Sequence, residues 1–147
     1  MSRDSWSYAN HYVSNTDDSF LNETMTAFVG RERELRLLAA ELERVAAGGE
    51  RPGRCLMVRG RRRVGKSRLV ERFIEKAGRA TLYFTAAGSP PAAEIRRFCA
   101  DAAESSLPGR DLLAAANPRD WDAAFRLLAA ALPDDAPAVV VVDEVSY

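Results

Sequence analysis

The chain has 147 residues, with 21 basic and 21 acidic side chains, so its formal net charge is zero. This length suits one domain with a sizeable core, and 47% hydrophobic with 29% charged residues excludes a disordered tail. The longest apolar run, Leu127 to Leu132, has six residues and is too short to span a bilayer. Two distant cysteines and one histidine predict neither a disulfide framework nor a zinc site. We therefore expect a cytoplasmic protein with no membrane segment.

The balanced charge hides a basic block. Residues 51–79 contain nine arginines and two lysines against two glutamates, whereas the segments 1–28 and 80–147 are both net acidic. A basic block inside a neutral protein is typical of a local anion site, because a general nucleic-acid surface normally raises the pI of the domain. We therefore expect a small anionic ligand, and the sequence does not favour a nucleic-acid partner.

The first segment of the chain, residues 1–26, is polar and carries aromatic residues at no clear period. Such a composition predicts a disordered or loosely attached extension. Met25 leaves open that residues 1–24 lie upstream of the natural start of translation. The organised part is then a single domain over residues 27–147.

Leucines at helical spacing predict a helix over residues 31–47, ended by Gly48. The apolar run 55–58 stands between glycines and is interpreted as a buried strand. The next apolar stripe predicts a helix from about residue 66 to 77, closed by Gly78.

Residues 81–84 predict a second strand. Ser89-Pro90 and Asn117-Pro118 each pair a capping residue with a proline, which predicts the starts of two further helices. Residues 138–142 are apolar without alternation, as in a strand buried on both faces. Strands that alternate with helices predict an α/β architecture with a parallel sheet.

Between the first predicted strand and the next helix, residues 60–67 read GRRRVGKS and fit G-x-x-x-x-G-K-[ST] at every fixed position. Gly60 and Gly65 allow backbone conformations in which successive N–H groups converge on phosphate oxygens. Lys66 would place its charge on the β- and γ-phosphates of ATP, and Ser67 would give its hydroxyl to Mg²⁺. The residues expected to bind the nucleotide here are Gly60, Arg61, Arg62, Arg63, Val64, Gly65, Lys66, Ser67 and Arg68. For the arginines at 61–63, phosphate contact, docking of an acidic partner and simple solvation all remain open.

The last predicted strand ends in two carboxylates, Asp143 and Glu144. Ligands bind at this end of the strands in open α/β sheets, so the pair matches a Walker B arrangement. Asp143 would hold Mg²⁺ opposite Ser67, and Glu144 would orient and activate the attacking water. The residues expected to be catalytic are therefore Glu144 and, through its charge on the phosphates, Lys66. Ser146 stands where Ras-type GTPases carry the glycine of D-x-x-G, which favours ATP. The alternative is that the two acids merely end a strand.

Four segments together resemble the archaeal-type ATPase family, an AAA+/STAND-related group of P-loop ATPases: Phe28-Val29-Gly30-Arg31-Glu32, the 60–67 loop, Leu82-Tyr83-Phe84, and Val142 to Tyr147. The resemblance covers residues 28–147. It implies a P-loop NTPase fold, a three-layer sandwich with a parallel sheet. It also implies that Val29 and Gly30 contact the adenine base, although a hydrophobic staple on the first helix explains Phe28 and Val29 equally well.

The resemblance further implies a longer protein, because members of the family continue with a sensor strand that inserts between the first and third strands found here. We therefore expect a truncated fragment with about three strands and exposed strand edges, open to a protein partner or to self-association. The first functional hypothesis is Mg-ATP binding with hydrolysis. The alternatives are a non-catalytic nucleotide-binding or interaction fragment and a STAND-type regulatory switch.

Overall fold

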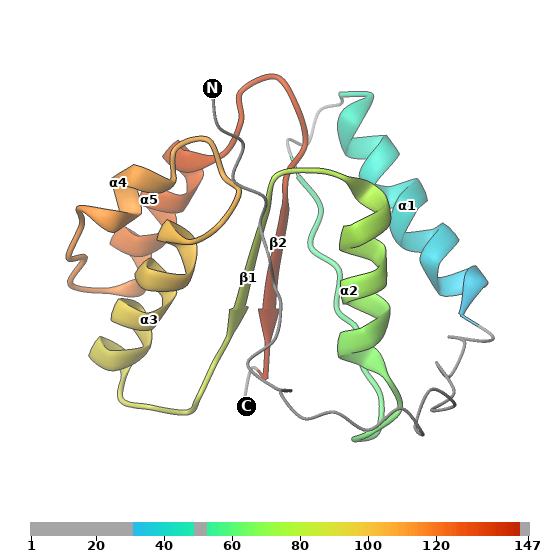
Figure 1. Cartoon of the computed structure of the whole chain (residues 1–147), viewed down its shortest axis with the longest axis horizontal. Coiled ribbons are helices and arrows are strands. Elements are labelled where there is room, and N and C mark those ends of the chain that lie inside the picture. The colour runs from blue at the N-terminus through green and yellow to red at the C-terminus, as the bar shows by residue number, and fades with distance from the viewer. Residues whose placement is uncertain (1–30, 49–52, 145–147) are drawn as a thin grey trace, which may run out of the picture.

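The computed structural model describes residues 31–48 and 53–144. In these residues two strands lie between two groups of helices, with α3, α4 and α5 on one side and α2, followed by α1, on the other (Figure 1). None of the helices in this part of the chain is long and apolar enough to cross a membrane. The expected extension over residues 1–26 lies outside the described residues. The elements are α1 (Glu32–Ala46), α2 (Lys66–Ala77), β1 (Thr81–Thr85), α3 (Pro91–Ala103), α4 (Arg110–Ala114), α5 (Trp121–Ala131) and β2 (Val139–Asp143).

The two strands β1 and β2 pair in parallel, with Thr81 opposite Val139 and Thr85 opposite Asp143. Because strands run in the same direction, both carboxyl ends reach the same edge of the sheet. This arrangement confirms the predicted α/β class with parallel strands. It also places the loop after β1 and the acidic end of β2 side by side.

The hydrophobic core lies between β1 and the helices α3 to α5. Leu82 and Phe84 point from β1 into this core and are buried. The ring of Phe84 meets that of Phe98 edge-on at 5.4 Å between centroids, and Phe98 meets Trp121 in the same way at 5.5 Å. Such aromatic contacts add to the free energy of area burial, so β1 is the most firmly held strand. The buried cluster contains Leu82, Phe84, Ile95, Phe98, Cys99, Ala102, Leu107, Leu113, Ala124, Leu128 and Ala131.

The prediction of a strand at residues 55–58 is wrong. This segment has no regular secondary structure and is exposed throughout, with Leu56 at 50% of its full accessibility. A strand forms only where a neighbouring backbone completes its hydrogen bonds. The sheet of the described residues contains β1 and β2 alone, so the apolar composition of residues 55–58 is not sufficient to make them a strand.

The prediction that β2 is buried on both faces is also wrong. Its residues alternate between half-buried and exposed, and Val140 and Val142 are the exposed ones. They pair with Leu82 and Phe84 and therefore belong to the same face of the sheet. The core cluster includes the two β1 side chains but neither valine. The helices on this face thus cover β1 and leave β2 accessible. Self-association through exposed strand edges stays a prediction.

The helix starts differ from those expected. Pro90 is the N-cap of α3, with Pro91 in the first turn, so the serine before them does not cap this helix. Asp120 is the N-cap of α5, and its carboxylate accepts the N–H of Ala123 at 2.8 Å. In both cases the capping residue lies one or more positions after the predicted one. An aspartate closer to the first helical turn can compete successfully with an upstream asparagine, since both bind the same free N–H groups.

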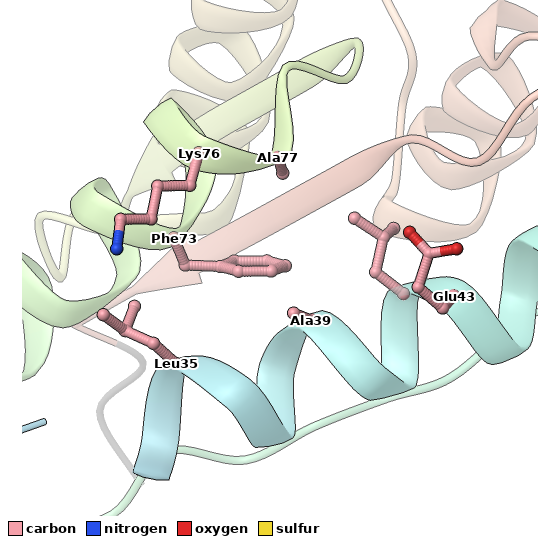
Figure 2. A pocket seen from close by; sticks show the side chains of 7 residues that line it. Leu35, Ala39, Glu43, Phe73, Lys76 and Ala77 are labelled. Carbon is pink, nitrogen blue, oxygen red and sulfur yellow. The ribbon is translucent and has the colours of Figure 1, made fainter. Parts of the chain in front are cut away.

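The first helix, α1, forms as predicted and packs on α2 (Figure 2). Leu35 and Ala39 of α1 face Phe73 of α2 across a gap of about 160 Å³, and the ring of Phe73 points into it. The remaining lining residues are Leu42, Glu43, Lys76 and Ala77. This gap adjoins the carboxyl-terminal half of α2, whereas the predicted phosphate loop precedes the other end of that helix. The gap is therefore separate from the candidate site.

Candidate functional site

The loop over residues 60–67 has the backbone conformation for which its glycines were expected. Gly65 is the N-cap of α2 and has a φ of 79°, in the left-handed region that glycine tolerates best. Arg63 also has a positive φ, 63°. A Cβ on Gly60 would lie 3.3 Å from Cγ2 of Val64, so the two ends of the loop approach closely. The loop therefore curls back on itself directly before a helix N-terminus.

That helix N-terminus provides backbone donors. Helix α2 begins at Lys66, and the first N–H groups of any helix have no acceptor within the helix. No acidic residue lies in the first turn, so the positive end of the helix dipole is not neutralised by its own side chains. Arg61, Arg62 and Arg68 are exposed beside it. This combination favours an anion at the loop.

The ammonium group of Lys66 lies across the loop. Its Nζ donates to the carbonyl oxygens of Gly60 at 3.2 Å and Arg61 at 3.1 Å. An ammonium group has three donors, so one N–H remains for another acceptor. Lys66 thereby links the end of the loop to its start and keeps its positive charge beside the loop.

The hydroxyl of Ser67 meets the carboxylate of Asp143. Ser67 Oγ donates to Asp143 Oδ2 at 2.9 Å, although the two residues are 76 positions apart in the sequence. The other oxygen, Oδ1, accepts the backbone N–H of Glu144 at 2.9 Å. Partial burial acts to raise the pKa of Asp143, but these hydrogen bonds, a third from Tyr83 and the charge of Lys66 lower it on balance. Asp143 is therefore an anion at neutral pH.

Tyr83 is the third donor to Asp143, and it is not among the site residues predicted from the sequence. Its hydroxyl donates to Asp143 Oδ2 at 2.8 Å. Burial, the hydrogen bond to Asp143 and the charge of that carboxylate raise the pKa of Tyr83 to about 12. The phenol thus stays protonated and remains a donor. The alternation of β1, which buries Leu82 and Phe84 on the opposite face, is the signal that could have indicated it.

Glu144 follows β2 with a φ of 53°, a left-handed conformation that is unusual for a residue with a side chain. Its side chain is exposed, at the carboxyl end of the sheet and next to Asp143. Non-glycine residues with such backbone strain are found frequently at functional sites. The catalytic role predicted for Glu144 stays a prediction.

Arg31, which is not among the site residues predicted from the sequence, contacts the loop. Its Nη2 donates to the carbonyl oxygen of Val64 at 2.6 Å, and its Nη1 lies 3.5 Å from Glu34. The guanidinium therefore links the start of α1 to the turn that precedes α2. The predicted base contacts Val29 and Gly30 lie outside the described residues.

A loop beside the site is held by a buried carboxylate. Glu94 of α3 is only 6% exposed, and its Oε1 accepts the N–H groups of Ala87 at 3.0 Å and Ser89 at 2.7 Å. The hydrogen bond from Ser89 contributes most to lowering the pKa of Glu94, and burial opposes it. The hydrogen bond from Ala87 and the positive charge of Arg97 lower this pKa further. The loop that follows β1 is thereby fixed next to the end of β2.

The donor chemistry at Ser67 and Asp143 fits a magnesium ion. A hydroxyl and a carboxylate oxygen 2.9 Å apart are hard oxygen ligands, and Mg²⁺ in proteins takes one or two such ligands together with phosphate oxygens and water. Within residues 31–48 and 53–144 no cluster of three or more His, Cys, Asp or Glu side chains could hold a metal alone. A Mg²⁺ ion held by Ser67 and Asp143 would take its remaining ligands from phosphate oxygens and water.

Comparison with protein families identifies the family of the chain. The model of a protein family described as the AAA ATPase domain matches residues 27–146. This span contains every described residue of the loop, of the strands and of the acidic pair. Neither a curated protein nor a solved structure matches the chain significantly.

Proposed function

Because the chain belongs to the AAA ATPase domain family, we propose that it binds Mg-ATP at residues 60–67 and hydrolyses it to ADP and phosphate. The observation that supports this most is the hydrogen bond between Ser67 and Asp143. It joins a loop of phosphate-binding shape to the acidic end of a parallel strand. Family membership alone implies a nucleotide-binding module of ATPase type, and the residue roles below are our proposal.

In this proposal the triphosphate lies in the curl of the loop. Backbone N–H groups of the loop and of the first turn of α2 donate to its oxygens, and Lys66 exchanges a loop carbonyl for a phosphate oxygen. The exchange is favourable because a charge-assisted bond to phosphate is stronger than a bond to a neutral carbonyl. The hydrogen bonds from Lys66 to the carbonyl oxygens of Gly60 and Arg61, at 3.2 and 3.1 Å, hold the ammonium group near the ligand and can be exchanged for bonds to phosphate.

Ser67 and Asp143 are the residues that would hold Mg²⁺. When bound, the ion neutralises charge that develops on the phosphate oxygens. Ser67 can use an oxygen lone pair for a cation and still donate its proton to Asp143, since a hydroxyl has one donor and two acceptor sites. The pair seen in the structure therefore does not need to break when the cation binds.

Glu144 is proposed to accept a proton from the attacking water, while Lys66 stabilises the negative charge of the transferred phosphoryl group. A carboxylate next to Asp143, at the open end of the sheet, can reach a water beside the terminal phosphate. The exposed side chain of Glu144 and its strained backbone agree with this role. We further propose that the chain is part of a larger AAA+/STAND-related ATPase of archaeal type, because the motif that ends in Arg31 and Glu32 stands at the start of α1, as in that family.

The proposal is tested by calorimetric titration of the purified chain with ATP in the presence of Mg²⁺. We expect Lys66→Ala to weaken binding at least about tenfold, since a charged hydrogen bond to phosphate is lost. Lys76→Ala is the matched control, because Lys76 is the other lysine of the chain and lies at the far end of α2. Equal binding by Lys66→Ala and the wild type would overturn the proposed site.

Hydrolysis is tested separately with Glu144→Gln. We expect phosphate release to fall by about 10² or more while Mg-ATP binding persists, as for the loss of a general base. Binding without any turnover in the wild type would instead support the non-catalytic nucleotide-binding module. Competition between ATP and GTP for the same site measures the expected preference for adenine.

A further inference from the structure

The register of the sheet explains why Tyr83 reaches Asp143. In the parallel pair, Thr85 is opposite Asp143 and Tyr83 is opposite Val141. Tyr83 and Asp143 are therefore diagonal neighbours on one face, a separation of about 7–8 Å that long aromatic side chains can bridge. A serine or threonine at position 83 would be too short. Only a long side chain with a terminal donor can make the 2.8 Å bond from this position.

The chemistry of position 83 argues against simple space filling. Tyr83 is half-buried, and burial contributes most to its raised pKa. Removing a hydroxyl from water is unfavourable unless the group finds a partner, and phenylalanine would fill the same volume without that penalty. The phenol has a partner in Asp143. The hydrogen bond to Asp143, rather than packing, thus explains why residue 83 is a tyrosine and not a phenylalanine.

Three donors fix the carboxylate of Asp143. Oδ2 accepts from Ser67 of α2 and from Tyr83 of β1, and Oδ1 accepts the N–H of Glu144. A carboxylate has about four lone-pair sites. Three are occupied by protein donors, and Tyr83 supplies the only one of these that comes from the neighbouring strand.

We propose that Tyr83 is a positioning residue that orients the Asp143 carboxylate toward Ser67 and thereby strengthens the binding of Mg²⁺ with the nucleotide. This inference rests on the proposed function. Hydrogen-bond partners that orient metal ligands commonly change metal affinity by 10–100-fold when they are removed. Tyr83 acts through Asp143 and needs no contact with the nucleotide itself.

The test is Tyr83→Phe, which removes one oxygen and keeps the ring. Nucleotide affinity is measured by calorimetry with Mg²⁺ and again with EDTA, and the Mg²⁺ concentration for half-maximal enhancement is determined. We expect the nucleotide affinity in EDTA to stay within about twofold and the required Mg²⁺ concentration to rise about tenfold. In an Asp143→Asn background the same substitution has no further effect, because the two residues act as a unit.

Ser106→Ala is the matched control. Ser106 Oγ accepts the N–H of Thr81 at 2.8 Å, so this variant removes a hydroxyl bonded to the opposite end of the same strand. It leaves the Mg²⁺ dependence unchanged. Thermal melts of both variants verify that the fold is intact.

Two results overturn the inference while leaving the proposed function in place. In one, Tyr83→Phe has the same Mg²⁺ dependence as the wild type. In the other, it weakens binding equally with Mg²⁺ and with EDTA, which indicates a structural role for the hydroxyl. A folded wild-type chain that binds no nucleotide under either condition overturns the proposed function itself, and the inference with it.

Discussion

The guanidinium of Arg31 and the carbonyl oxygen of Val64 lie 2.6 Å apart, 33 residues from each other in the sequence. Val64 stands in the turn between Arg63 and Gly65, both of which have a positive φ. Arg31 is the residue directly before α1. One side chain thus connects the first helix to the most strained part of the loop over residues 60–67.

We expect Arg31→Ala to weaken Mg-ATP binding by about threefold to tenfold. An exposed hydrogen bond from a charged group contributes about 1 kcal/mol, and the loop loses its support from α1. The measurement is calorimetric titration, with Arg33→Ala as the control, because Arg33 is exposed on the same helix. An unchanged affinity in Arg31→Ala would show that the loop keeps its shape without this contact.

Gly65→Ala tests the backbone of the loop. No atom lies within 4 Å of an added Cβ at this position, so the methyl group meets no steric obstacle. The φ of 79° is nevertheless unfavourable for alanine by about 1–2 kcal/mol. We expect a lower thermal midpoint and a nucleotide affinity reduced at least about tenfold, as the loop relaxes away from its curl. Retained affinity would place the anion site elsewhere.

Gly109→Ala tests steric crowding rather than backbone strain. Gly109 has an ordinary φ of −95°, but an added Cβ would lie 2.6 Å from the Cα of Ala131. Helix α5 must then shift, and we expect a loss of about 1–3 kcal/mol in the free energy of unfolding. Chemical denaturation measures this loss. The folded variant keeps its nucleotide affinity, since Gly109 belongs to the helical side of the core.

The two cysteines report on the segment that was predicted to be a strand. Cys55 is exposed, whereas Cys99 is buried and burial raises the pKa of its thiol. We expect a disulfide reagent to modify one thiol rapidly in the native protein and the second only after unfolding. Peptide mass mapping identifies the fast site, and Cys55→Ala removes the fast phase. Two slow thiols would mean that residues 55–58 are buried after all.

The loop after β1 is expected to respond to acid through Glu94. The folded state lowers the pKa of this carboxyl below its ordinary value of 4.5. The stabilisation it gives is therefore complete above that value and is lost as the pH falls through the lowered pKa. Thermal melts from pH 7 to pH 3 should show the wild type more stable than Glu94→Gln near neutrality, with the difference shrinking below the ordinary value. Glu104→Gln, an exposed glutamate at the end of α3, controls for the loss of one charge.

Local patterns in the sequence predicted most of the helices and the backbone conformation at Gly65 in the loop over residues 60–67. The helix over 32–46, the left-handed Gly78 and the positive φ of Gly65 all follow from spacing or from a residue's own conformational range. The proximity of Ser67 and Asp143 was also predicted, although the strand at residues 55–58 on which that prediction relied does not form in the described residues.

Features that depend on distant neighbours were not predictable in the same way. Residues 55–58 have a strand-like composition but pair with no strand among the described residues. The exposure of Val140 depends on how far the helices extend over the sheet. Tyr83 and Arg31 became site residues only through register and packing, since neither belongs to the fixed positions of the loop motif. Which strands pair, and which faces of the sheet the helices cover, are properties of the assembled fold and cannot be deduced from local sequence patterns.

At Glu144 the left-handed backbone conformation and the proposed need for a carboxylate favour different residue types. Glycine or asparagine adopts a φ of 53° more easily than glutamate does, so either one would relieve the backbone strain at residue 144. Glycine at this position should raise the melting temperature and, where Glu144 serves as the base, abolish turnover. With the proposed role of Glu144, selection for thermostability alone would enrich substitutions at residue 144 and yield a more stable protein that binds nucleotide without hydrolysing it.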